Sequence, residues 1–215
     1  VEVLNAGCGT GQQPIDTALR LAGARILAVD LSLASLAYGA RMAQAMGVDN
    51  VEFAQADLLE LGTLAQRFDL IESTGVLHHL AQPAEGLRVL AGLLAPGGAM
   101  RLSLYSQAAR RGVVAARALI EDLGLQPTPD GIRRCRAAIA ALPPSAPARA
   151  VMAFADFHSL SECRDLLFHV QEHRFDLPGV GALLAGAGLP HLGRELEPAQ
   201  RAAAAGASGP QATSS

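Results

Sequence analysis

The chain has 215 residues, a formal net charge of −3 at pH 7 and 50% hydrophobic residues. This apolar fraction excludes an intrinsically disordered chain, and the length suits one α/β domain with room for a lid. The small negative charge gives no general attraction to nucleic acid or to an anionic membrane, so neither is an expected partner.

The cysteines and the apolar runs bear on the cell compartment. Three scattered cysteines without a Cys-x-x-Cys pair indicate free thiols in a reducing, cytoplasmic setting and give no zinc site. No apolar run reaches the roughly 18–20 residues that span a bilayer. Because Val1 already lies inside the first predicted strand, we expect the chain to be part of a longer protein.

Short apolar segments alternate with helical segments through the first half of the chain. This alternation predicts an α/β fold, a doubly wound, mainly parallel sheet with helices on both faces. The carboxyl ends of such strands meet at one edge, where ligands bind. The predicted strands are residues 1–5, 25–29, 51–55, 68–72 and 99–105, and the predicted helices are residues 11–22, 33–46 and 83–94.

The alternation stops after Tyr105. We expect one domain over residues 1–198, with an inserted helical lid over about 106–188 that is too long for a plain crossover. The later predicted elements are helices at 107–123, 131–142 and 180–187 and a last strand at 189–196, with no seventh strand after it. Residues 199–215 have no apolar periodicity and are predicted to be disordered.

A glycine-rich loop follows the first predicted strand. Glycines allow a tight turn and close approach to a ligand, and the following helix begins with free N–H groups. The third glycine comes one residue earlier than in the dinucleotide-binding pattern G-x-G-x-x-G, and a plain strand–helix turn is the alternative reading. The candidate ligand contacts here are Asn5, Gly7, Cys8, Gly9, Gly11 and Gln12.

Two carboxylates follow the next two strands. Asp30 is placed to accept hydrogen bonds from the vicinal hydroxyls of a ribose, which both NAD and S-adenosylmethionine (SAM) carry. The alternative role, a helix N-cap, suits Ser32 better. Asp57 could accept from an adenine amino group while the ring packs on Leu58, or it could be a turn aspartate.

Five motifs in order resemble class I SAM-dependent methyltransferases, and the resemblance covers residues 1 to about 105. They are VLNAGCGTG (3–11), AVDLS (28–32), QADL (55–58), FDLIESTGVLHHL (68–80) and LLAPGG (93–98). The resemblance implies SAM as cofactor, with its methionine end on the glycine loop, its ribose on Asp30 and its adenine on Asp57. The implied cofactor contacts are Asn5, Gly7, Cys8, Gly9, Gly11, Gln12, Asp30, Leu31, Asp57, Leu58, Ser73 and Thr74.

The sequence departs from that family in two places. Asn5 stands where the family has a carboxylate that helps to hold the methionine amino group, so this position carries no charge. The family also closes its sheet with a seventh strand that is not found here. A missing edge strand leaves an open sheet edge and less core packing.

Histidines supply the candidate catalytic groups. His78 and His79 could act as a general base at the transfer channel formed by residues 74–79. Alternatively, one packs against the lid and the other caps the loop. His169 and His173 stand four residues apart on a predicted helix, a spacing that can bind a metal, but no further ligand pattern supports a metal site.

A second resemblance covers residues 156–175 of the lid. This segment is similar to bacterial methyltransferase domains that often follow tetratricopeptide repeats, which implies tethered repeats in the full-length protein. We expect residues 154–175 to be anchored to the sheet edge by their apolar side chains, which are Phe154, Phe157, Leu166, Leu167, Phe168 and Val170. The polar residues His158, Arg164, Glu172 and His173 would then contact the methyl acceptor. Alternatively, the segment only covers SAM.

The predicted function is methyl transfer from SAM to an unidentified acceptor, more readily a small molecule. A nicotinamide dehydrogenase is disfavoured by the glycine spacing. A protein or RNA methyltransferase would use the same SAM site, but the absence of a (D/N)-P-P-(Y/F) motif disfavours amide and base amino acceptors. A non-catalytic SAM-binding module is the third alternative.

Overall fold

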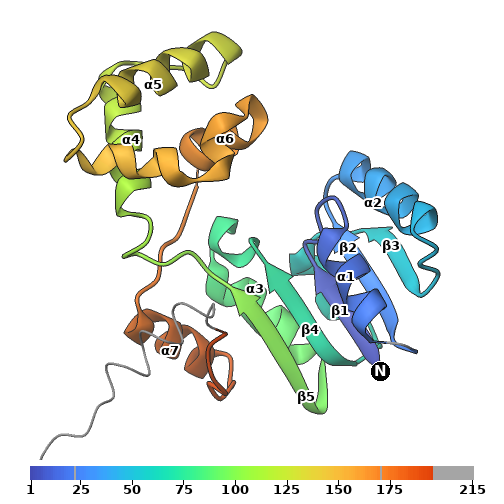
Figure 1. Ribbon diagram of the computed structural model, residues 1–215. Coiled ribbons are helices and arrows are strands. Elements are labelled where there is room, and N and C mark those ends of the chain that lie inside the picture. Colours follow the sequence, from blue (N-terminus) through green and yellow to red (C-terminus); the bar gives the residue numbers. More distant parts are fainter. Residues whose placement is uncertain (22, 170, 196–215) are drawn as a thin grey trace, which may run out of the picture.

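The computed structural model describes residues 1–21, 23–169 and 171–195 (Figure 1). Its five strands are all parallel and lie in the order β3-β2-β1-β4-β5. They are β1 (Glu2–Ala6), β2 (Arg25–Asp30), β3 (Val51–Gln55), β4 (Phe68–Thr74) and β5 (Leu94–Ser103). The predicted doubly wound sheet is confirmed, and its switch point lies between β1 and β4.

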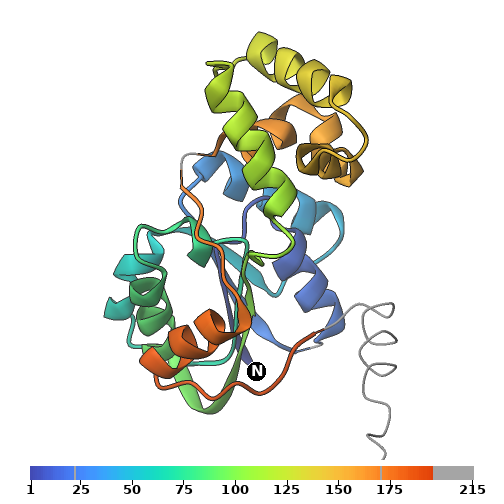
Figure 2. The ribbon, with the colours of Figure 1, turned by 90° about the vertical axis from the view of Figure 1, so that its left-hand side faces the viewer.

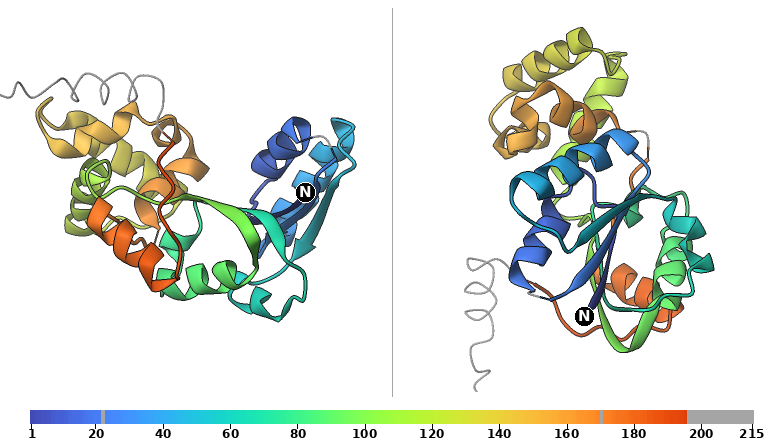
Figure 3. Two further views of the ribbon diagram at one scale, coloured as in Figure 1. Left: turned by 90° about the horizontal axis from the view of Figure 1, so that it is seen from below. Right: turned by 90° about the vertical axis from the view of Figure 1, so that its right-hand side faces the viewer.

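Both faces of the sheet are covered, as Figure 3 shows. The two faces of β1 alternate: Val3 packs with Ala18 of α1, and Leu4 packs with Leu87 of α3. This burial on both sides explains why the strands read as continuous apolar runs. Helices α1 (Gln12–Arg20) and α2 (Leu33–Ala45) cover one face; α3 (Pro83–Gly92), the 3-10 helix η1 (Leu58–Thr63) and α7 (Leu177–Gly186) cover the other.

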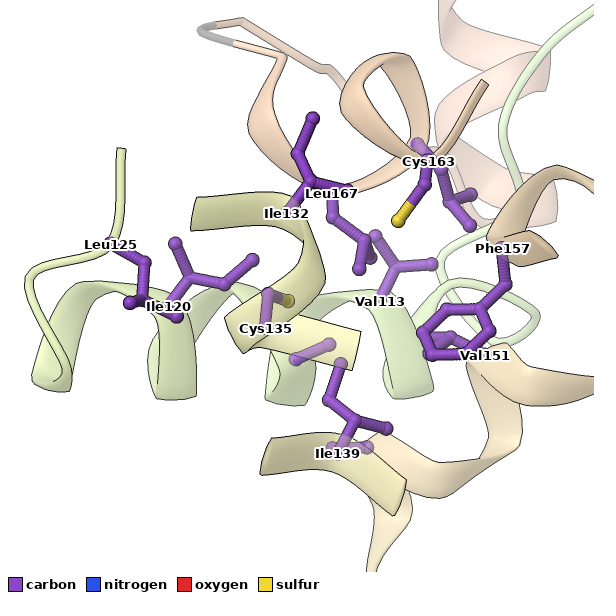
Figure 4. Packing of buried hydrophobic residues seen from close by; sticks show 13 residues of the cluster. Val113, Ile120, Leu125, Ile132, Cys135, Ile139, Val151, Phe157, Cys163 and Leu167 are labelled. Atoms are coloured by element: carbon purple, nitrogen blue, oxygen red, sulfur yellow. The ribbon is translucent and has the colours of Figure 1, made fainter. Parts of the chain in front are cut away.

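A separate helical unit lies beyond the carboxyl ends of the strands (Figures 1 and 2). Its core contains Val113, Ile132, Phe157 and Leu167 (Figure 4), and among the described residues this core shares no buried residue with the clusters under the sheet. We call this set of elements the helical unit: α4 (Arg111–Asp122), α5 (Pro129–Ala141), the 3-10 helices η3 (Pro147–Ala153) and η4 (Ala155–His158), and α6 (Leu160–Phe168).

The structure corrects the predicted extent of the lid. We expected it to run to about residue 188, but α7 packs against α3 through apolar residues such as Leu183 and Leu184 and belongs to the sheet layers. We also expected Phe157, Leu166 and Leu167 to anchor residues 154–175 to the sheet edge. They pack instead into the core of the helical unit, because α4 and α5 offer the apolar faces that they bury.

Two further predictions of secondary structure are wrong. Residues 189–195 form an irregular segment instead of a strand. Within it, Leu189 packs against the core on the α3 side of the sheet. The helix that was to carry His169 and His173 ends at Phe168, so these histidines do not share a helical face. Residue 196 and the predicted disordered tail, 199–215, lie outside the described residues. No helix in the described part of the chain is long and apolar enough to cross a membrane.

Candidate cofactor site

The glycine loop wraps the end of β1 against β2 and β4. The backbone N–H groups of Gly7 and Cys8 both donate to the carbonyl oxygen of Val29, at 2.8 and 2.9 Å. Gly7 has φ +84°, and a Cβ there would lie 2.1 Å from Cγ2 of Val76. A glycine is therefore required at this position both by the backbone conformation and by the close approach of the β4 loop.

Asp30, at the end of β2, binds the backbone of the same loop. Its Oδ2 accepts from the backbone N–H of Gly9 at 2.8 Å, and its Oδ1 accepts from the N–H of Ser32 at 2.9 Å. Ser32 is the N-cap of α2, as predicted, because its Oγ accepts from the N–H of Ser35. Asp30 is thus held in one orientation while its carboxylate faces a cavity, which is the arrangement needed to bind a ribose diol.

A cavity of about 590 Å³ opens at the carboxyl edge, over the switch point. It joins the glycine loop, the end of β4 and the inner face of α1. Space remains open beside Gly9, where a Cβ would meet nothing within 4 Å. The lining residues are Gly7, Cys8, Gly9, Thr10, Gln12, Gln13, Asp16, Thr17, Arg20, Asp30, Thr74, Gly75 and Arg101.

Half of the predicted cofactor contacts line this cavity. These are Gly7, Cys8, Gly9, Gln12, Asp30 and Thr74. Gly11 instead packs its backbone against Gly39 of α2, and Leu31 is exposed beside Asp30. Asn5 and Ser73 lie buried beneath the loop, where the Ser73 hydroxyl donates to the carbonyl oxygen of Ala6.

The proposed adenine contacts lie elsewhere. The Asp57 carboxylate accepts from the N–H of Leu59 and so caps η1, which is the alternative role of a turn aspartate. Leu58 is buried in the core under α3. Neither residue lines the cavity, and adenine recognition by this pair stays a prediction.

Cys8 lies on the cavity wall but is unsuited to nucleophilic chemistry. Burial, with the nearby charge of Asp30, raises the pKa of its thiol to about 12. The thiol is therefore protonated at neutral pH and acts as a small, weakly polar lining group.

Glu72 forms a charged network that the sequence analysis missed. Its side chain is only 4% exposed, and its carboxylate accepts from Thr17 Oγ1 at 2.7 Å, Asn5 Nδ2 at 3.5 Å and Arg101 Nη1 at 3.3 Å. Asn5 and Glu72 are direct partners in the β1–β4 ladder. An aspartate at position 5 would set two carboxylates face to face, so the uncharged Asn5 is explained by Glu72.

Arg101 of β5 extends this network to the surface. Its guanidinium also donates to Glu195, and its pKa lies above the usual value, mainly because of that hydrogen bond. Thr17 and Arg101 both line the cavity. Glu72 is buried beside them and accepts a hydrogen bond from each. The signal available in the sequence was a charged residue, Glu72, at the end of an otherwise mostly apolar predicted strand.

The two candidate catalytic histidines lie outside the cavity. His78 is fully buried and stacks on Tyr105 with ring centroids 3.6 Å apart, and neither of its ring nitrogens has a hydrogen-bond partner among the described residues. Burial, with smaller contributions from neighbouring charges, lowers its pKa to about 4. His79 packs on His169, and burial lowers its pKa as well. A catalytic role for either histidine stays a prediction.

The site fits a nucleoside with a charged amino-acid tail. The open glycine loop admits a ligand close to the backbone, Asp30 offers acceptors for a diol, and charged side chains line the α1 end. Within the described residues, no group of three or more His, Cys, Asp or Glu side chains could hold a metal ion. Together with the strand order, these features define a class I SAM-dependent methyltransferase domain.

Residues 1–129 match a family described as a methyltransferase domain, and the chain belongs to this family. An uncharacterized protein from Synechococcus sp. is 33% identical over 198 residues, which cover 89% of this chain and 48% of that protein. The ubiquinone biosynthesis O-methyltransferase of Acinetobacter baumannii is 34% identical over 98 residues, 45% of this chain and 40% of the relative.

A solved structure has a fold similar to that of this chain. PKMT2 from Rickettsia typhi, in complex with AdoHcy, superimposes with a TM-score of 0.69 over 96% of this chain and 43% of that one, at 20% identity. At this identity the likeness shows the fold alone. The chain spans about half the length, or less, of the relatives that it matches.

Proposed function

We propose that this domain transfers the methyl group of SAM to a small-molecule acceptor. The observation that carries the proposal is the cavity at the switch point, where the glycine loop, Asp30 and the end of β4 converge. When bound there, SAM supplies an electrophilic methyl group on a sulfonium.

The chain's own residues would bind and orient the cofactor. Asp30 would accept hydrogen bonds from the ribose, and the open backbone at Gly9 would admit the ligand close to the loop. Thr74 and Gly75 would line the path toward the acceptor. Methyl transfer from a sulfonium depends strongly on the alignment of the reacting groups, so this positioning is the main contribution that we assign to the domain.

Two observations support a small acceptor over a macromolecule. The segment after β4, Ser73–Thr74–Gly75–Val76, lacks the (D/N)-P-P-(Y/F) motif of amino-methylating enzymes. A relative that matches nearly half of the chain is named as an O-methyltransferase of ubiquinone biosynthesis.

Of the polar residues expected to contact the acceptor, His158 and Arg164 are exposed on the helical unit, whereas Glu172 forms a buried ion pair.

Calorimetry and turnover together test the proposal. The purified chain should bind SAM and S-adenosylhomocysteine at least about tenfold more tightly than NAD, and Asp30→Ala should cost about 1.5–3 kcal/mol of SAM affinity. Asp49→Asn, an exposed change between α2 and β3, is the matched control. NAD binding that equals or exceeds SAM binding would contradict a SAM site.

The second stage uses SAM with a labelled methyl group. With a pool of small metabolites, the wild-type chain should release S-adenosylhomocysteine and label a small product, and Asp30→Ala should do so far more slowly. Labelling confined to protein or RNA would contradict the small acceptor. Binding of SAM without transfer to any of these pools would favour a non-catalytic module.

A further inference from the structure

Arg101, which lines the cavity, holds a carboxylate on the Nε–Nη2 edge of its guanidinium. Its Nε and Nη2 atoms lie 2.9 and 2.8 Å from the same oxygen of Glu195, while Nη1 donates to Glu72 on the other side. The Nε–Nη2 edge of a guanidinium is well suited to a carboxylate, which it can bind through two hydrogen bonds. Arg101 therefore bridges two carboxylates in this structure.

The two carboxylates differ in how firmly they are held. Glu72 is 4% exposed and is also fixed by Thr17, so it serves as a permanent anchor. Glu195 is 69% exposed and has no other hydrogen bond among the described residues. An exposed ion pair of this kind contributes at most about 1 kcal/mol, so another carboxylate can replace Glu195 at little cost.

The cavity brings this arginine to the cofactor. Arg101 and Thr17 line the same cavity as Gly9 and Asp30, on the side formed by α1 and β5. SAM has a ribose near one end and an α-carboxylate at the other. With the ribose on Asp30, the amino-acid end must leave Asp30 along the glycine loop. Among the described residues, the basic side chains on this cavity's wall are Arg20 and Arg101.

We propose that Arg101 binds the α-carboxylate of the methionine moiety of SAM in place of Glu195, and that Glu72 is the positioning residue that aims Arg101. The inference rests on the proposed use of SAM. Of the two arginines, Arg101 is favoured because its guanidinium is already held by a buried carboxylate. The ligand carboxylate would then exchange for the Glu195 carboxylate, which is 69% exposed and would be solvated by water instead.

Decarboxylated SAM isolates this interaction, because it keeps the adenosine, the sulfonium and the amino group but lacks the carboxylate. We expect Arg101→Gln to weaken SAM binding roughly ten- to hundredfold by calorimetry, the range for a hydrogen bond to a charged group. Binding of decarboxylated SAM should change less than about twofold. Arg88→Gln, on the exposed side of α3, is the matched control and should alter neither affinity.

Two further variants test the separate roles of Glu72, which positions Arg101, and Glu195, which competes with the ligand. Glu72→Gln should lower the preference for SAM over decarboxylated SAM, because Arg101 loses its anchor; a purely structural effect would weaken both ligands equally. Glu195→Gln should tighten SAM binding about two- to fivefold, because a competing surface carboxylate is removed.

Equal losses for both ligands in Arg101→Gln, or unchanged SAM affinity, would overturn the assignment. So would weaker SAM binding in Glu195→Gln, or a carboxylate-specific loss confined to Arg20→Gln, which would place the contact on α1. If the wild-type chain binds SAM no better than NAD, the proposed function itself fails. In contrast, SAM binding that is tighter than NAD binding but unchanged in Arg101→Gln would overturn only the assignment of Arg101.

Discussion

Arg110 and Glu172, 62 residues apart in the chain, form a two-pronged ion pair at the base of the helical unit. Arg110 stands directly before α4, and Glu172 lies in the segment that returns from α6 to the sheet. Arg117 adds a third charge, with Nη2 3.0 Å from Glu172 Oε2. The side chains of Arg110 and Glu172 are 10% and 1% exposed, so the pair ties the two connecting segments together away from water.

Removal of the carboxylate should destabilise the helical unit. We expect Glu172→Gln to lower the free energy of unfolding by about 3–5 kcal/mol, because it leaves buried guanidinium groups without their counter-charge. Urea denaturation followed by circular dichroism measures this loss. Glu121→Gln, an exposed change on α4, is the control, and a loss no larger than that of the control would contradict the role of the pair.

The same pair predicts a response to acid. Burial alone would raise the pKa of Glu172, but Arg110 and Arg117 outweigh it and hold the pKa below the ordinary 4.5. A carboxyl group whose pKa is lower in the folded state stabilises the fold above its unfolded pKa, and this stability is lost as the pH falls through the folded value. The difference between wild type and Glu172→Gln should therefore shrink below pH 4.5.

His78 predicts a pH effect in a different window. The unfolded chain binds a proton at this residue near pH 6.5, whereas the folded chain does so only at about 4. The folded state therefore loses stability as the pH falls from 6.5 to 4, by at most about 3 kcal/mol. Unfolding measured at pH 7.5 and pH 5 should show this slope, and His78→Leu should reduce it.

His191→Gln, an exposed histidine, is the control and should keep the wild-type slope. His78→Leu should also bind S-adenosylhomocysteine as the wild type does, because His78 does not line the cavity. A slope that persists in His78→Leu would assign the pH response to other groups. Loss of cofactor affinity in this variant would connect His78 to the site after all.

Asn5→Asp should be destabilising although it restores the residue typical of the family. The new carboxylate would face the buried carboxylate of Glu72, and like charges at this distance cannot both ionise cheaply. We expect a loss of roughly 2–3 kcal/mol at pH 7, equivalent to about two pKa units. The double variant Asn5→Asp with Glu72→Gln should recover most of it; an additive double variant would contradict the coupling.

Gly7→Ala tests the steric contact below the loop. The added Cβ would collide with Val76, and its left-handed backbone conformation costs about 1–2 kcal/mol in addition. Gly97→Ala, with φ +80° and open space around its Cβ, isolates the conformational cost. Thermal unfolding should show a larger loss for Gly7→Ala than for Gly97→Ala. Adding Val76→Ala to Gly7→Ala should recover part of the difference, because it removes the Cγ2 atom at 2.1 Å but leaves Cβ at 3.1 Å.

The sheet could be predicted because its information is local. Each strand is a short apolar run that ends at a turn residue, and the ligand edge follows from the geometry of parallel crossovers. The glycine loop and Asp30 lie where the motifs placed them for the same reason. Strand ends differ by a few residues, as for β5, which begins at Leu94 because its pairing with β4 starts before an irregularity between Phe68 and Leu70.

The parts that failed depend on contacts between distant segments. The apolar pattern of residues 180–187 predicts a helix but does not say which layer it covers, and only the tertiary structure assigns α7 to α3 instead of to the lid. Glu72 gains its importance from Thr17 and Arg101, which are 55 and 29 residues away. The predicted role of Glu172 in acceptor binding ignored the two arginines that enclose it.

The separate core of the helical unit makes this insertion a module. Its buried residues, from Val113 to Leu167, include none of those that pack under the sheet in the described part of the chain. Drift in the sequence of the module can therefore reshape its surface without disturbing strand register or the glycine loop. Selection can act on the surface of the helical unit and on the cofactor cavity as two independent traits, because the described residues of the two share no core and no lining.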